Sequence, residues 1–283
     1  MNKRDQEMTA SSGAARIEDE GNKIDNTLNI GQSDNICQTD KTQEVNNTSH
    51  PDGSDKIGQS DKADKALASD KYDARCAWCS VEACCHDSKD NLPLFCPMDN
   101  SPEVYSKALA IVNSPEYSSF YQESARIEHD GYGRWPRVRE TLELIKRMGY
   151  KKVGLAFCHG LVQEAKAFAE ICRDNDIELV TAMCKTGGCD KCHAGIRDEE
   201  KLRPGQFEPM CNPVAQAMIL NEAGTEFNVL LGLCVGHDSL FYKYSEALCT
   251  TLVVKDRATG HNPAVALYQK DGYFKSKLDL NNK

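Results

Sequence analysis

The chain has no aromatic residue in its N-terminal part, since residues 1–71 contain no Phe, Trp or Tyr. This stretch is rich in Asp, Lys, Ser, Asn, Gln and Gly. Such a composition cannot bury enough apolar surface to offset the entropy that ordering the chain costs. We therefore expect residues 1–71 to form a disordered acidic tail.

Long apolar runs and clusters of basic residues are also missing. No run approaches the roughly 20 apolar residues that span a bilayer, and the first ten residues, MNKRDQEMTA, lack the apolar core of a signal peptide. The net charge is −9, and no stretch supplies the clustered Lys and Arg that phosphate contacts need. These absences predict a cytoplasmic protein that binds neither membranes nor nucleic acid.

The signatures of several large enzyme classes are absent as well. The sequence contains no GxGxxG, Walker, GxSxG or HExxH pattern. Nucleotide-dependent hydride transfer and P-loop chemistry therefore lack their usual motifs.

Cysteine, in contrast, is abundant, with 14 residues in 283. In a reducing compartment, clustered cysteines are more often metal ligands or reactive thiols than disulfides. The cysteines therefore carry the best information about function.

The second half of the chain alternates strand-like and helical patterns. Strands are expected at residues 152–158, 177–183, 227–233 and 249–255, with helices at about 161–174, 213–223 and 238–245. This alternation predicts an α/β fold, in which a parallel sheet of about four strands is flanked by helices over residues 151–283. A helical connector over residues 100–150, with helices at about 101–112, 114–129 and 137–148, is expected to precede it.

Three of the expected strands run directly into cysteines: Cys158, Cys184 and Cys234. Parallel strands place their carboxyl ends at one edge of the sheet, where open α/β sheets bind ligands. Cys211 precedes a helix start, which favours a thiolate. If these four sulfurs converge, a [4Fe–4S] cluster is a physically reasonable occupant; alternatively they supply a nucleophilic thiolate, or individual cysteines are buried packing residues.

Polar residues follow the last two strands. His237 is expected to act as a proton donor or metal ligand, or else to bond to its own turn. Lys255 is available as an acid or base when buried, and Arg257 is suited to bind an anionic group. Together with Cys234, the expected catalytic residues are His237, Lys255, Asp256, Arg257 and His261. The alternative is that Asp256 pairs with Lys255 or Arg257 on a solvated loop.

The long connection from Cys184 to Cys211 holds a further pair, Cys189 and Cys192. With Cys184 and Cys211, this pair matches the ligand spacing of plant-type [2Fe–2S] ferredoxins. It is equally compatible with a redox dithiol. Connections of this length are commonly functional or mobile.

A separate cysteine-rich segment covers residues 72–99. It contains Cys76, Cys79, Cys84 and Cys96, with Cys85 and His86 as substitutes for one ligand. A Cys-x2-Cys pair brings two thiolates to one metal, and two later cysteines complete a tetrahedral shell. The segment predicts a zinc site or an iron–sulfur cluster, and the alternative is a set of plain reduced thiols.

Several motifs resemble the domain of unknown function 1847 family. They are CAWC at 76–79, CPM at 96–98, the run from Cys184 to Pro213, GLCVGHDSLF at 232–241 and VVKDRATGHNP at 253–263. The resemblance covers roughly residues 73–270. The family is described in general terms as metal-binding proteins, so the resemblance implies a metal at the N-terminal cysteines and identifies no substrate.

Two functional hypotheses follow. The first is an iron–sulfur or thiol-dependent enzyme that acts on a small molecule in reductive or sulfur-transfer chemistry, with an electron donor protein as a partner. The second is a non-catalytic module that binds zinc or another metal, or senses a ligand. Substitution of Cys234 separates the two, because a loss of turnover with a retained fold supports catalysis.

Overall fold

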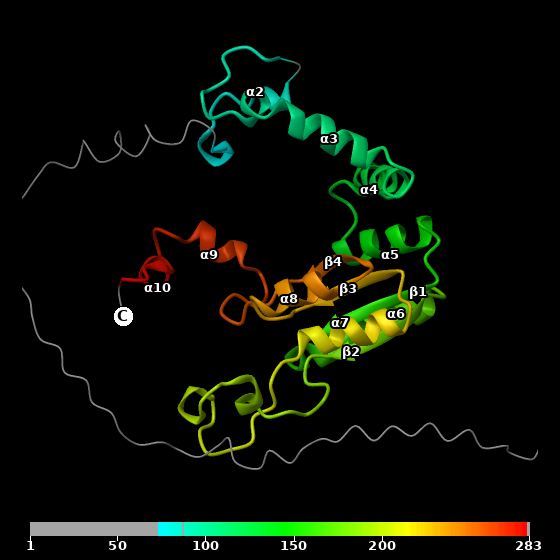
Figure 1. The fold of residues 1–283 in the computed structure, drawn as a ribbon, viewed down its shortest axis with the longest axis vertical. Coiled ribbons are helices and arrows are strands. Elements are labelled where there is room, and N and C mark those ends of the chain that lie inside the picture. The colour runs from blue at the N-terminus through cyan, green and yellow to red at the C-terminus, as the bar shows by residue number, and fades with distance from the viewer. Residues whose placement is uncertain (1–72, 87, 282–283) are drawn as a thin grey trace, which may run out of the picture. The chain divides into compact units, whose positions relative to one another are not determined.

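The computed structural model describes residues 73–86 and 88–281 (Figure 1). The tail expected over residues 1–71 lies outside these residues. The described part of the chain begins with the 3-10 helices Cys76–Trp78 and Ala83–Cys85, which precede helices α2 (Pro97–Asn100) and α3 (Pro102–Val112). It ends with helices α9 (Ala264–Tyr268) and α10 (Lys275–Leu278).

Four parallel strands form one sheet in the order β2-β1-β3-β4. The strands are β1 (Lys152–Phe157), β2 (Glu178–Met183), β3 (Phe227–Leu231) and β4 (Leu248–Val253). The predicted fold class, a four-stranded parallel α/β sheet flanked by helices, is thus confirmed. Strand β2 follows β1 in the chain and pairs with one side of it, whereas β3 pairs with the other side of β1. The strand order therefore reverses between β1 and β3. Open α/β sheets bind their ligands beside such a point.

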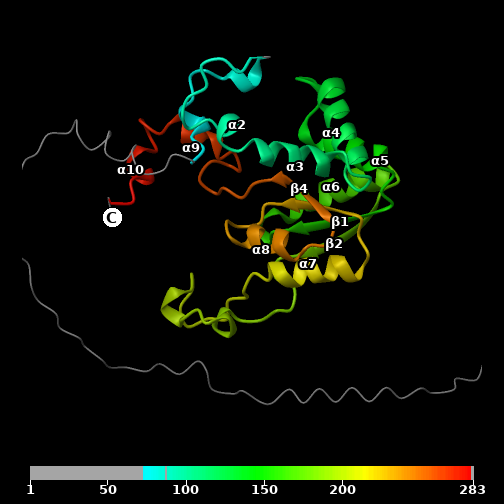
Figure 2. The same cartoon turned by 45° about the horizontal axis from the view of Figure 1, so that its top comes forward.

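Helices cover both faces of the sheet, which gives two apolar cores (Figure 2). On one face, Leu155 and Val229 pack with residues of α5 (Arg137–Arg147) and α6 (Val162–Asp174). On the other, Ala156 and Leu230 pack with α7 (Pro213–Glu222) and α8 (His237–Tyr244). The faces alternate along each strand because successive strand side chains point in opposite directions.

Helix α4 (Ser118–Gly131) begins later than the Ser-Pro-Glu signal indicated. Residues 114–117 form a turn, in which the N–H groups of Tyr117 and Ser118 both donate to the Ser114 carbonyl. The Ser114 hydroxyl is buried without a hydrogen-bond partner and does not cap a helix there. The expected start at residue 114 was therefore wrong by one turn, whereas α5 follows its prediction closely. Helix α4 packs on the sheet through Phe120, whose ring centroid lies 6.1 Å from that of Phe227.

A buried amide in the sheet depends on a glycine in the neighbouring strand. Asn228 is fully buried, accepts a hydrogen bond from Thr225 Oγ1 at 2.8 Å and donates one to Ser245 Oγ at 2.8 Å. Gly154 is its register partner on β1, and a Cβ there would lie 2.0 Å from Asn228 Oδ1. The glycine therefore leaves the space that the asparagine side chain fills.

Among the described residues, no helix combines the length and apolar character needed to cross a bilayer.

Candidate functional site

Two of the cysteines continue the pattern of the strands that precede them. Ala156 of β1 is the register partner of Ala182 of β2, and both side chains face α7. Cys158 and Cys184 follow two residues later on the same face. The Cys184 N–H still donates to the Phe157 carbonyl, at 2.9 Å, so the strand pairing extends to the cysteines. Their sulfurs therefore meet at the carboxyl edge of the sheet, as the sequence predicted.

All four strand-edge cysteines line one small pocket, which has no room for a water molecule. Cys158 and Cys184 are buried, whereas Cys211 and Cys234 are partly exposed. The complete lining is Cys158, Cys184, Cys211, Gln216, Leu233, Cys234 and His237. We call this cavity the thiol pocket. All four cysteines that were predicted to converge line it.

The Cys184 thiol lies at the centre of a row of three sulfurs. It lines the same pocket as Cys158 and Cys211 and is close enough to both to change their pKa values. The backbone N–H of His159 also donates to its sulfur at 3.3 Å. Contact with the Cys158 and Cys211 sulfurs, together with burial, raises the pKa of Cys184 well above the ordinary range for a thiol. Cys184 is therefore the member of the row that keeps its proton.

Cys158 is surrounded by groups that favour its thiolate. Hydrogen bonding from Cys184 is the largest effect and lowers the pKa of Cys158 to about 4. The Gly160 N–H and the Lys255 ammonium add to it, while burial opposes it. Lys255 thus lies at this edge, close to Cys158, and its expected role as an acid or base stays a prediction.

Cys211 has a similar environment but is more accessible. Its pKa falls to about 5, first because of the hydrogen bond from Cys184 and then because of Lys185 and His237, against the effect of burial. Lys185 Nζ donates to the Cys211 sulfur at 3.3 Å and to the Pro209 carbonyl at 2.6 Å. The lysine is therefore fixed in place beside the sulfur.

Arg257 reaches the same pocket from the loop after β4. Its guanidinium donates to the Cys234 sulfur at 3.5 Å. The pKa of Arg257 is raised, chiefly by Cys234 and to a lesser extent by the charges of Cys158 and Cys211. Since Arg257 is itself exposed, it is available to an anionic group that approaches the pocket from solvent.

Two polar atoms at the pocket have no hydrogen-bond partner. Gln216 is fully buried, and its amide nitrogen donates to the carbonyls of Phe157 (3.2 Å) and Ala182 (2.7 Å). Those bonds fix the orientation of the amide and leave its oxygen unpaired. Nδ1 of His237, the first residue of α8, is also buried and unpaired. A buried unpaired polar atom is costly, which makes both atoms candidates to contact a ligand.

Asp256 and His261 form a local loop instead of reaching the sulfurs. The Asp256 carboxylate accepts from the N–H groups of Ala258 (2.9 Å) and Thr259 (3.1 Å). His261 has a positive φ of 69°, and its Nδ1 accepts the Asp256 N–H at 3.1 Å. These contacts give both residues a role in shaping the loop that holds Lys255 and Arg257. A catalytic role for them stays a prediction.

The long connection after β2 is organised by a buried ion pair. Lys201 Nζ lies 2.9 Å from Asp190 Oδ1, and Asp190 also accepts from the N–H groups of Cys192 (3.0 Å) and Glu208 (2.7 Å). Cys189 is exposed, and neither Cys189 nor Cys192 lines the thiol pocket. The ferredoxin-like ligand set is therefore not assembled as the structure stands.

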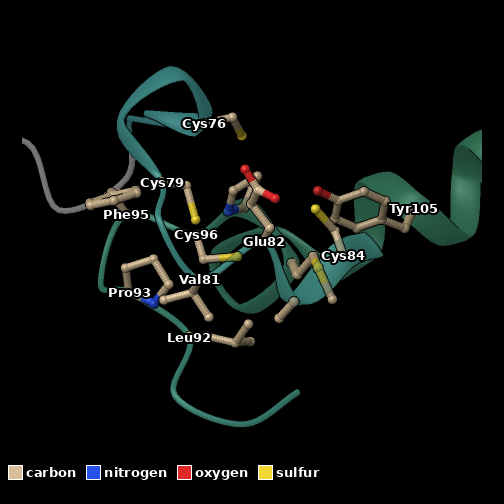
Figure 3. Close-up of a pocket in the computed structure, with 13 residues that line it drawn as sticks. Cys76, Cys79, Val81, Glu82, Cys84, Leu92, Pro93, Phe95, Cys96 and Tyr105 are labelled. Atoms are coloured by element: carbon tan, nitrogen blue, oxygen red, sulfur yellow. The ribbon is translucent and has the colours of Figure 1, made fainter. Parts of the chain in front are cut away.

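The four N-terminal cysteines line a pocket of their own (Figure 3). Figure 3 shows Cys76, Cys79 and Cys96 around it, with Glu82 between Cys76 and Cys84. Cys84 is in hydrogen-bonding contact with Cys85, which raises the pKa of Cys85. Among the described residues of the 72–99 segment, Ala83 alone is buried. The segment therefore has almost no apolar core of its own.

Neither cysteine set forms a finished metal site. Within residues 73–86 and 88–281, no three or more His, Cys, Asp or Glu side chains are arranged to hold a metal ion. The zinc and iron–sulfur assignments therefore stay predictions.

Sequence reasoning missed Gln216, which lines the thiol pocket, and Lys185, whose ammonium donates to the Cys211 sulfur. Lys185 directly follows a strand-end cysteine, a position that offered a signal for a cation beside a thiolate. Gln216 follows the helix-capping Asn212 on the face of α7 that also carries the buried Leu220. A polar residue on an otherwise apolar helix face is the signal that would have identified it.

The comparisons with known proteins identify relatives but no activity. A family model described as "Protein of unknown function (DUF1847)" matches residues 96–252. "Uncharacterized protein MJ0455" of Methanocaldococcus jannaschii is 40% identical over 204 residues, which cover 72% of this chain and 97% of that protein. No solved structure matches. The matched range contains the whole thiol pocket, and the resemblance inferred from the sequence motifs is confirmed: the chain belongs to the DUF1847 family.

Proposed function

We propose that the protein is a thiol-dependent enzyme that acts on a small molecule at the thiol pocket. The observation that carries this proposal is the row of three sulfurs. The Cys184 thiol lies between the sulfurs of Cys158 and Cys211, and each of these two has a lysine ammonium beside it. A thiolate is the nucleophilic form of cysteine, and adjacent cations and hydrogen-bond donors favour it. Cys211 is the attacking group, because it is partly exposed whereas Cys158 is buried.

The other groups at this edge have separate tasks in the proposed reaction. Arg257 binds an anionic part of the substrate, and His237 presents an unpaired ring nitrogen for proton transfer or binding. Cys234, beside Arg257, is the second partly exposed thiol. The chemistry proposed is reductive or sulfur-transfer chemistry, with an electron donor for the reductive case.

Alkylation of the anaerobically purified full chain tests this proposal. Iodoacetamide modification of Cys211, followed across pH by peptide mass spectrometry, is expected to reach half its maximal rate near pH 5. A midpoint near the ordinary thiol value of about 8.5 would contradict the proposal. Iron, zinc and sulfide are quantified in the same sample. An iron–sulfur cluster lost on substitution of the strand-edge cysteines would replace the thiolate proposal with a cluster enzyme.

A second candidate function is supported by the N-terminal pocket. Cys76 and Cys79 from the start of the segment and Cys96 from its end line one pocket, although the segment has almost no apolar core. A bound zinc ion or cluster would join the two ends, as metals do in small domains that lack sufficient packing. The protein would then be a metal-binding or sensing module, alone or in addition to the enzyme.

A further inference from the structure

The thiol pocket places Cys184 within reach of two other cysteines, Cys158 and Cys211. Cys184 and Cys211 are close in the backbone as well, because the Asn212 N–H donates to the Cys184 carbonyl at 2.8 Å. Cys158 and Cys184 are neighbours across the β1–β2 pairing. A disulfide needs cysteines whose Cα atoms lie within about 7 Å and whose side chains converge. Both pairs have converging side chains, so Cys184 is a shared partner for two alternative disulfides.

The exposure of each cysteine determines which of them a substrate reaches first. Cys211 is partly exposed, Cys184 is 2% exposed and Cys158 is 7% exposed. A substrate therefore meets Cys211 first, and Cys184 and Cys158 lie behind it. Two cationic groups lie beside the partly exposed sulfurs, since the Lys185 ammonium donates to Cys211 and the Arg257 guanidinium to Cys234, and they favour a substrate that carries a negative charge.

From this geometry we infer that the site reduces the disulfide bond of an anionic small molecule, with Cys211 as the attacking thiolate and Cys184 as the thiol that resolves the mixed disulfide. This inference rests on the thiol-dependent function proposed above and adds the class of substrate. The role of resolving thiol fits both the burial of Cys184 and its position between two other sulfurs.

The reaction balances in two exchange steps. The Cys211 thiolate attacks one sulfur of the substrate R–S–S–R′, a bond forms between Cys211 and R–S, and R′–S⁻ leaves. The Cys184 proton then passes by way of the neighbouring Cys158 thiolate to the departing R–S⁻, which leaves as R–SH, while the Cys184 sulfur attacks the Cys211 sulfur. The substrate gains two electrons, and the protein is left with a Cys184–Cys211 disulfide.

The buried Cys158 thiolate extends this sequence by one exchange. Its attack on the Cys184 sulfur transfers the disulfide to Cys158–Cys184 and frees the Cys211 thiolate for another substrate. An external dithiol, either a small molecule or a protein, is the reductant that restores the starting state by the same exchange chemistry.

Glutathione disulfide is a suitable anionic probe for the reduced full chain under anaerobic conditions. After acid quenching and alkylation, peptide mapping of the wild type is expected to show a Cys184–Cys211 or Cys158–Cys184 disulfide. In Cys184→Ser, glutathione is expected to remain attached to Cys211, because no thiol resolves the mixed disulfide. The matched control Cys249→Ser, which alters a cysteine outside the row, is expected to behave as the wild type.

Three results would overturn the inference: no internal disulfide in the wild type, no glutathione on Cys211 of Cys184→Ser, or a Cys158–Cys184 disulfide that forms at an unchanged rate in Cys211→Ser. Circular dichroism shows whether the variants fold, and the wild-type mapping needs no variant. Iodoacetamide reactivity measured in parallel distinguishes the two proposals. A reactive Cys211 without an internal disulfide would leave the thiolate function standing and reject the disulfide substrate.

Discussion

At the scale of single residues, the reactivity of the thiol pocket depends on which groups supply hydrogen bonds and charge to each sulfur. Cys211 has three such supports: the buried thiol of Cys184, the ammonium of Lys185 and, as the weakest of the three, the charge of His237. The second support is open to test, because Lys185 has its own fixed position through the Pro209 carbonyl.

Substitution Lys185→Met is expected to raise the pKa of Cys211, since it removes both a donor and a positive charge. The folded protein holds this thiol as a thiolate above about pH 5, so reactivity is lost as the pH falls through that value. In the variant, the midpoint of the alkylation profile should move upward by about one pH unit. Lys166→Met, which removes an exposed charge on α6, is the control. Equal midpoints in the two variants would contradict the assignment.

At the scale of elements, the sheet depends on a matched pair on neighbouring strands, Gly154 and Asn228. Gly154→Ala would force a methyl group against Asn228 Oδ1 and against Leu220. We expect the free energy of unfolding, measured by urea denaturation, to fall by about 2 kcal/mol, as in overpacked cores. Gly160→Ala is the control, because its added Cβ would meet only the mobile end of Lys255, at 3.2 Å, and the Cys158 sulfur, at 3.9 Å.

A double variant shows whether the contact with Asn228 is the cause. Asn228→Ala alone should destabilise the fold by about 1–3 kcal/mol, since it removes the buried hydrogen bonds that Asn228 makes with Thr225 and Ser245. Combined with Gly154→Ala, the total loss should be smaller than the sum by about 1 kcal/mol, because the space becomes free. If the stability losses of the two single variants were strictly additive, residues other than Asn228 would accommodate the Cβ added at position 154.

The long connection after β2 owes its shape to the ion pair between Asp190 and Lys201. The N–H groups of Cys192 and Glu208, followed by the Lys201 ammonium, lower the pKa of Asp190. Its contribution to stability is therefore present at neutral pH and above the ordinary Asp value of about 4, and it is lost as the pH falls below that. Lys201→Met should speed hydrogen exchange of the Cys192 and Glu208 amides at pH 7.

The control for this element is Arg197→Met, which breaks an exposed ion pair with Glu200 in the same connection. Exposed pairs contribute little, so amide exchange at Cys192 and Glu208 should stay at the wild-type rate. If both variants exchanged equally fast, the buried pair would not be what orders the connection.

At the scale of the whole molecule, the cysteine-rich segment and the sheet differ in how many apolar residues they bury. The sheet has two apolar cores, whereas the segment over 73–99 buries Ala83 alone among its described residues. If a metal joins Cys76, Cys79, Cys84 and Cys96, a chelator should make this segment sensitive to protease and leave the sheet resistant. Cys79→Ser should reduce the metal content of the purified chain, and Cys249→Ser should not. Equal resistance with and without chelator would reject the metal clip.

The sequence was sufficient to predict the sheet and the convergence of Cys158, Cys184 and Cys234, because strand periodicity and parallel topology determine where strand ends lie. It did not indicate which sulfur keeps its proton. That depends on contacts made by Lys185, Lys255 and Cys184, which come from separate elements and meet only in the folded chain. The loop roles of Asp256 and His261 were likewise hidden, since both arise from backbone hydrogen bonds that residue types alone do not specify.

The hydrogen bond from Asn212 to Cys184 has a consequence for how this protein tolerates change. This bond holds together the two ends of the connection between Cys184 and Asn212. The length of that connection therefore does not determine where the Cys184 and Cys211 sulfurs lie. Relatives or engineered chains are free to trim, lengthen or exchange this insert as a module. The thiol pocket would stay where it is while the insert changes.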